Sequence, residues 1–90
     1  DNAFYLWGNR NVVVNNLYYN YCQNQSSDPI YQSGMVIRGS DNLVVNNKGF
    51  DDQPDVTQIY DIWLGYAQDS WFIYNMGEYG GEGTDNKVVE

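Results

Sequence analysis

The chain repeats a short pattern in which an apolar stretch of alternating character follows a polar turn. Each copy opens with a small residue, continues through two polar residues and an Asn or Ser, and then becomes apolar. The copies span residues 8–16, 39–47, 67–75 and 83–90, and the first three end in Asn. A period of two predicts β-strands, and a repeat of one strand and one turn predicts a solenoid of stacked rungs.

Alternation divides each copy between an inward and an outward face of its strand. The inward set includes the final Asn and is predicted to contain Val12, Val14, Leu43, Val45, Trp71 and Ile73. The outward set is predicted to contain Val13, Val44 and Phe72. A short strand also precedes each copy, and its predicted inward residues are Phe4, Leu6, Met35, Ile37, Ile62 and Leu64.

Three asparagines recur in register with the apolar residues. Asn16, Asn47 and Asn75 each lie five residues after the polar residue that opens the strand, at offsets of 31 and 28 residues. Side-chain amides at the same corner of successive rungs, about 4.8 Å apart, can hydrogen-bond to one another and to the turn backbone. The pattern therefore predicts an inward Asn ladder, with three separate hairpin turns as the alternative.

Composition narrows the class of protein. Ninety residues predict one domain, residues 1–90, and the many Tyr, Trp, Phe and Asn residues favour strands and turns over helices. A net charge of −8 disfavours binding to nucleic acid or to anionic membrane surfaces. The sequence has no His, so it cannot build a Ser–His or Cys–His catalytic pair, and the single Cys22 excludes an internal disulfide.

Residues 34–47 and 58–90 resemble rungs of the pectin-lyase-like right-handed parallel β-helix superfamily. The resemblance implies an all-β, right-handed parallel β-helix segment of about three rungs. The superfamily contains polysaccharide lyases, glycoside hydrolases, epimerases and phage tailspikes. No catalytic residue of these families can be matched to a position of this chain.

The resemblance implies an extracellular or virion-surface protein that acts on, or recognises, a polysaccharide or oligosaccharide. The tripeptide Asn24-Gln25-Ser26 is a glycosylation acceptor and favours the same setting. Three rungs form a prism only about 15 Å long with apolar ends, so the rest of a longer β-helix or other protomers are the expected partners. The alternative function is a structural or adhesive β-helix, such as a trimeric tailspike or a self-stacking fibre.

Two acidic sets are candidates for chemistry. Asp41 and Asp69 occupy equivalent turn positions, and two carboxyls about 5 Å apart can serve a retaining glycosidase as acid and base. The alternative is that both are ordinary turn residues that face solvent. Asp51, Asp52 and Asp55 have the density of oxygen ligands that a Ca²⁺ site needs, with a solvated loop as the alternative, and no other cofactor is expected.

Outward aromatic residues are the better candidates for binding. Tyr5, Trp7 and Tyr74 fall on outward positions by the alternation. Aromatic rings stack on the apolar faces of pyranoses, and neighbouring amides bind the hydroxyls, so these three residues are predicted to contact a glycan. The alternative is that loops or a neighbouring protomer cover them.

Overall fold

A computed structural model describes residues 2–20, 32–52 and 59–90. These residues form ten strands and no helix, so the expected all-β class is confirmed for the part of the chain described. The strands are β1 (Phe4–Trp7), β2 (Val12–Val14), β3 (Leu17–Tyr19), β4 (Ser33–Ser40), β5 (Leu43–Val45), β6 (Lys48–Phe50), β7 (Tyr60–Gln68), β8 (Trp71–Ile73), β9 (Tyr79–Gly80) and β10 (Lys87–Val89). A search of these residues for a helix able to cross a membrane finds none.

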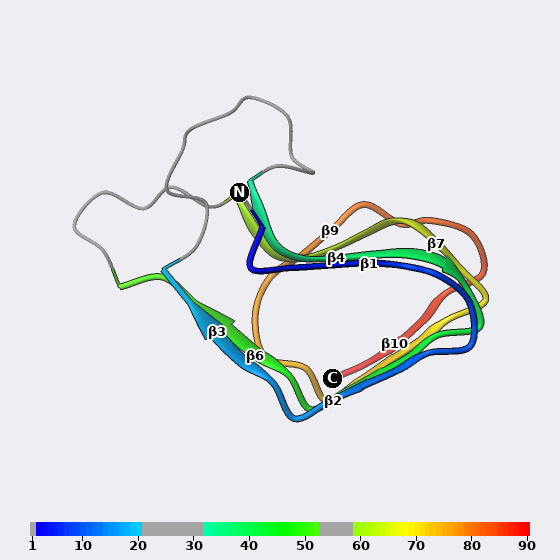
Figure 1. Cartoon of the computed structure of the whole chain (residues 1–90), viewed down its shortest axis with the longest axis horizontal. Coiled ribbons are helices and arrows are strands. Elements are labelled where there is room, and N and C mark those ends of the chain that lie inside the picture. The colour runs from blue at the N-terminus through cyan, green and yellow to red at the C-terminus, as the bar shows by residue number, and fades with distance from the viewer. Residues whose placement is uncertain (1, 21–31, 53–58) are drawn as a thin grey trace.

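The strands belong to three sheets in which every pair is parallel. Sheet A has the order β1-β4-β7-β9, sheet B the order β10-β8-β5-β2, and sheet C consists of β3 and β6. The chain visits sheet A and then sheet B four times, and the first two circuits also add a strand to sheet C before the chain returns to sheet A beside its previous strand. We call each circuit a pass, and successive passes lie side by side (Figure 1). The passes comprise residues 2–20, 32–52, 59–76 and 79–90.

The sheet register pairs the repeated positions of the sequence with one another. In sheet B, Val12 pairs with Leu43, Leu43 with Trp71, and Trp71 with Lys87. The offsets are therefore those of the sequence repeats, including the fourth copy. Parallel pairing in this register brings like residues of successive passes into contact, because a strand places its side chains with a period of two.

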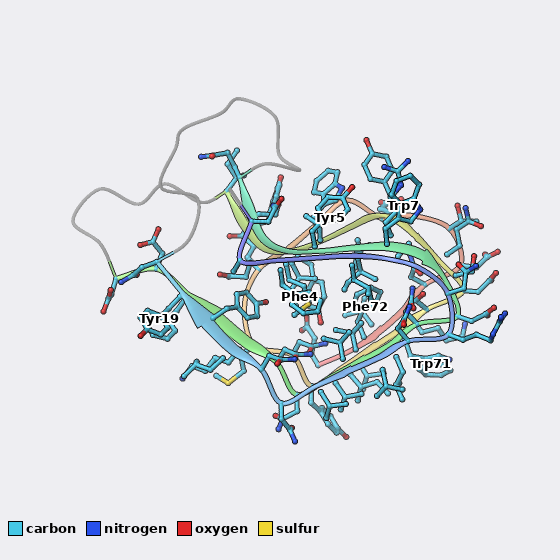
Figure 2. The ribbon with its side chains drawn as sticks, viewed as in Figure 1. Phe4, Tyr5, Trp7, Tyr19, Trp71 and Phe72 are labelled. Atoms are coloured by element: carbon cyan, nitrogen blue, oxygen red, sulfur yellow. The ribbon has the colours of Figure 1, made fainter. Side chains whose placement is uncertain are left out.

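The core lies between the sheets, and Figure 2 shows Phe4 and Phe72 on this inner side. The predicted inward residues Met35, Ile37, Ile62 and Leu64 are buried. The prediction for sheet B was wrong: Val13, Val44 and Phe72 are buried, whereas Val12 is 64% and Trp71 45% exposed. Also on the outer face are Val14, Leu43, Val45 and Ile73, which are exposed or only partly buried.

A left-handed residue explains this error. Asn46 lies between the strand and the inward Asn47 and has a φ of 55°. A residue in this conformation breaks the two-residue alternation, so counting back from Asn47 assigns every preceding residue to the wrong face. Counting forward from the buried Asn42 places Val44 inward, as the structure does.

Strand β7 contains a bulge that changes its outer face. Met35 pairs with Ile62 and Val36 with Trp63, but Arg38 pairs with Tyr66, so β7 carries one extra residue in this interval. Such a bulge redirects the side chains that follow it. Beyond the bulge, Tyr66 faces outward and Ala67 is buried.

Candidate functional site

The three ladder asparagines are joined by hydrogen bonds. The Asn47 Oδ1 accepts the backbone N–H of Asn16 at 2.9 Å and its side-chain amide at 3.0 Å. The Asn47 Nδ2 donates to the Val13 carbonyl at 3.1 Å and to the Asn75 Oδ1 at 2.9 Å. Asn75 in turn donates to the Tyr79 hydroxyl at 3.0 Å. The row fixes the corner between sheets B and C in three passes.

A second row of polar side chains fixes the corner between sheets A and B. These positions define the repeats in the sequence, and no hydrogen bonds are predicted for them there. The Asn42 Oδ1 accepts the backbone N–H of Asn11 at 2.9 Å, and the Ser70 Oγ accepts that of Asn42 at 3.0 Å. The Asn86 Oδ1 accepts the backbone N–H of Ser70 at 3.1 Å. The recurrence of Asn or Ser before each strand is the signal for this row, and it is present in all four copies.

Tyr74 lies at the corner after β8, not on sheet A with Tyr5 and Trp7. Its φ of 53° is left-handed, as are those of Asn15 and Asn46 at the same position of the earlier passes. The Asn46 Nδ2 donates to the Asn15 Oδ1 at 2.7 Å. Asn adopts this conformation readily, whereas an aromatic residue is strained in it. The structure therefore separates Tyr74 from the other two predicted glycan contacts.

We expect the substitution Tyr74→Asn to raise the free energy of unfolding by about 1 kcal/mol, because it relieves the left-handed strain of Tyr74. It also offers a third amide to the row of Asn15 and Asn46. Tyr74→Ala removes the same ring but keeps a side chain that disfavours positive φ, so it is the matched control and should give no gain. Urea unfolding followed by circular dichroism measures both, and equal stability of the two variants would contradict the strain argument.

Asp41 and Asp69 occupy equivalent turns on adjacent passes, and both are exposed. Their φ values of 58° and 48° are left-handed, a conformation that Asp tolerates better than most residues. No pocket is found around the described residues. The geometry thus gives both aspartates a role in the turns.

The acidic loop is described only in part. Asp51 is half-buried and Asp52 is exposed, and the backbone N–H of Asp52 donates to the Asn20 Oδ1 at 3.1 Å. Asp55, Cys22 and the tripeptide at Asn24 lie outside the described residues. Within the described ranges, no three acidic or sulfur ligands come together as a metal site would require.

The outer face of sheet A carries a cluster that we call the aromatic platform. It consists of Tyr5, Trp7, Trp63 and Tyr66 with Arg38 among them. The register places Trp7, Arg38 and Tyr66 in one row across β1, β4 and β7. Figure 2 shows Tyr5 and Trp7 pointing away from sheet A on the side opposite to Phe4 and Phe72. The alternation of the sequence predicts Tyr5 and Trp7 as binding residues but misses Tyr66 and Arg38.

Arg38 connects the rings of the platform. Its guanidinium carbon lies 4.3 Å from the centroid of the Trp7 ring and 5.1 Å from that of Tyr66, distances at which a cation is attracted to an aromatic face. Its Nη1 also lies 3.5 Å from the Tyr5 hydroxyl. Nevertheless Trp7 remains 72% and Tyr66 49% exposed, so a large part of both rings is accessible to a ligand.

Trp63 forms the inner edge of the platform. It packs against Tyr60, with ring centroids 5.7 Å apart, and a Cβ on Gly65 would lie 2.8 Å from its indole ring. Gly65 is therefore required by the close approach of this ring. The Trp63 Nε1 is buried and has no hydrogen-bond partner among the described residues.

The outer face of sheet B is apolar. Its outward positions alternate with the buried Val13, Val44 and Phe72, and all but Lys87 are apolar. They are Val12, Val14, Leu43, Val45, Trp71, Ile73, Lys87 and Val89. Strands of a parallel sheet that are apolar on both faces are normally covered on both faces. This face is therefore a candidate contact surface, distinct from the aromatic platform.

Two tyrosines, the buried Tyr18 and the partly buried Tyr79, have shifted pKa values. Tyr18 faces inward from β3 and its hydroxyl donates to the Asp61 carbonyl at 3.2 Å. Burial raises the pKa of Tyr18 well above its usual value, and the charge of Asp61 adds to the effect. Burial also raises the pKa of Tyr79, which the hydrogen bond with Asn75 opposes.

We expect the protein to lose stability as the pH rises above about 10, where tyrosines of the unfolded chain ionise but the folded Tyr18 keeps its proton. The stabilisation is fully present below that pH, and its slope is about 1.4 kcal/mol per pH unit for Tyr18. Tyr18→Phe should reduce the slope while the contribution of Tyr79 remains. Unfolding free energies measured from neutral to alkaline pH test this, and an unchanged slope in the variant would refute it.

Comparison of the chain with known protein families, with curated proteins and with solved structures finds no match.

Proposed function

We propose that this chain is a segment of a right-handed parallel β-helix of about three rungs, similar to the pectin-lyase-like superfamily. The parallel sheets support the proposal, since every pass enters sheet A and then sheet B, and so do the two rows of hydrogen-bonded polar side chains at the corners. In this proposal the first three passes are the rungs, and residues 79–90, with β9 and β10 alone, begin a fourth. The setting is extracellular or the surface of a virion.

The proposed function is the binding of a polysaccharide or oligosaccharide by the aromatic platform. Its support is a set of exposed rings on one sheet face, with an arginine held among them. Rings of this kind stack on the apolar faces of sugars, while guanidinium N–H groups donate to hydroxyls. If the whole protein is a lyase, hydrolase or epimerase, this segment supplies scaffold and an edge of the glycan site.

Substitution of Trp7 tests this function. Trp7→Ala should weaken glycan binding about tenfold, since an aromatic contact contributes on the order of 1 kcal/mol beyond its buried area. Trp71→Ala is the matched control, because Trp71 is also exposed but lies on sheet B. Binding is measured by titration calorimetry with each member of a set of purified oligosaccharides. Equal losses in the two variants, or no binding by the unsubstituted chain, would contradict the proposal.

The apolar outer face of sheet B favours a second candidate, a structural β-helix whose protomers pack through this face. Contiguous apolar patches of this kind mark contact surfaces in soluble proteins. Trp71→Glu would place a charge in such an interface and should shift a trimer or other oligomer toward monomer in analytical ultracentrifugation. A chain that sediments as a monomer with either residue at position 71 would exclude this candidate.

A further inference from the structure

Resting on the proposed function, we infer that the glycan lies across the strands of sheet A, along the row of Trp7, Arg38 and Tyr66. We further infer that the ligand is an unbranched, uncharged oligosaccharide of at least three sugars. The row crosses three passes, so a ligand that follows it contacts residues from three separate parts of the sequence.

The bulge in β7 creates this row. If β7 had no bulge, the register that pairs Val36 with Trp63 would continue and place Gly65 opposite Arg38. The bulge places Tyr66 there instead, with its ring 5.1 Å from the guanidinium. Bulges are over-represented beside active sites, where they redirect a side chain. Here the redirected side chain provides the second ring of the row.

The length of the ligand follows from the strand spacing. Trp7 is on β1 and Tyr66 on β7, two strands away, so the two positions are separated by about 9.6 Å. One sugar ring cannot contact both aromatic side chains across that separation. A sugar at each ring with at least one between them matches the row, and Arg38 lies beneath the middle one.

The charge of the ligand follows from the surroundings of Arg38. The protein carries 12 acidic and 4 basic residues, so its overall field repels an anionic chain. Arg38 already has an aromatic ring on two sides, and these rings attract its charge. Its remaining N–H groups are suited to sugar hydroxyls and ring oxygens, which take hydrogen bonds without requiring a net charge.

A length series on the intact chain tests this inference. The probes are linear neutral oligosaccharides of increasing length, branched ones of equal size, and the uronate forms of the linear series, all titrated by calorimetry. Affinity should rise about tenfold between the disaccharide and the trisaccharide or tetrasaccharide, as a second aromatic contact forms. Tyr66→Ala should abolish this rise, whereas Trp71→Ala should leave it intact.

The outcomes separate this inference from the proposed function. Binding that depends on Trp7 but neither on ligand length nor on Tyr66 would overturn the path along the row and leave glycan binding intact. If the uronate series binds more tightly than the neutral series, and salt or Arg38→Gln weakens that binding, the inference that the ligand is uncharged is wrong. Failure of every probe to bind would instead refute the proposed function. Circular dichroism of each variant confirms that the fold is retained.

Discussion

Replacement of Phe72 by Ala should lower the free energy of unfolding by about 4 kcal/mol, the loss typical of a large buried aromatic residue. Phe72 is fully buried at the centre of β8. Its ring packs edge-on against that of Tyr79, with ring centroids 6.0 Å apart, and this contact joins sheets A and B. Urea unfolding of the chain measures the change.

The neighbouring substitution Trp71→Ala is the control for this result. Trp71 is the larger residue, but it is 45% exposed on the outer face of sheet B. Its loss should cost less than about 1 kcal/mol, as expected for a side chain outside the core. The reverse order, with the larger loss at Trp71, would mean that β8 faces the other way.

Asn47→Ala should cost roughly 3 kcal/mol, because it leaves several buried polar groups without partners. Asn47 is 1% exposed and its side chain makes four hydrogen bonds with Asn16, Val13 and Asn75. Each buried donor or acceptor that loses its partner costs about 1–3 kcal/mol. Among the polar side chains of the described residues, this is the largest effect that we expect from a substitution.

Two further variants define the ladder effect. Asn16 belongs to the same row but is exposed, and its side chain makes one hydrogen bond within the row, from its Nδ2 to the Asn47 Oδ1. Asn16→Ala should therefore cost about 1 kcal/mol or less. Asn47→Asp keeps the acceptor but buries a carboxylate against the Val13 carbonyl and the Asn75 Oδ1, so near neutral pH it should cost at least as much as Asn47→Ala. Equal stabilities of the Asn16→Ala and Asn47→Ala variants would show that the amides do not act as a buried row.

Much of the fold is predictable from the sequence because the repeats carry physical constraints. A buried amide needs partners, so three asparagines in register are enough to indicate a hydrogen-bonded row. Tyr5 and Trp7 are assigned to the outer face correctly because no left-handed residue interrupts β1. The faces of sheet B are inverted in the prediction because a left-handed residue, Asn46 in the second pass, separates the strand from the inward Asn.

Only part of the aromatic platform can be predicted from the sequence. Tyr66 and Arg38 come together through the β7 bulge, and periodicity alone does not place a bulge. An isolated glycine inside a strand pattern is the known signal for one, and Gly65 is such a residue. The second row of hydrogen bonds is harder to recognise because Ser70 replaces Asn in the third copy, although its hydroxyl accepts the same backbone N–H.

The most direct test of glycan binding by the outer face of sheet A uses the three tryptophans of the chain, which report on different places. Trp7 lies on the exposed row, Trp63 has a buried Nε1, and Trp71 lies on sheet B. The measurement is a titration of the ¹⁵N-labelled chain with a linear oligosaccharide, followed by the three indole N–H resonances. Glycan binding on sheet A should shift the Trp7 resonance progressively until the chain is saturated, while the Trp71 resonance stays in place. A shift of Trp71 without one of Trp7 would contradict it.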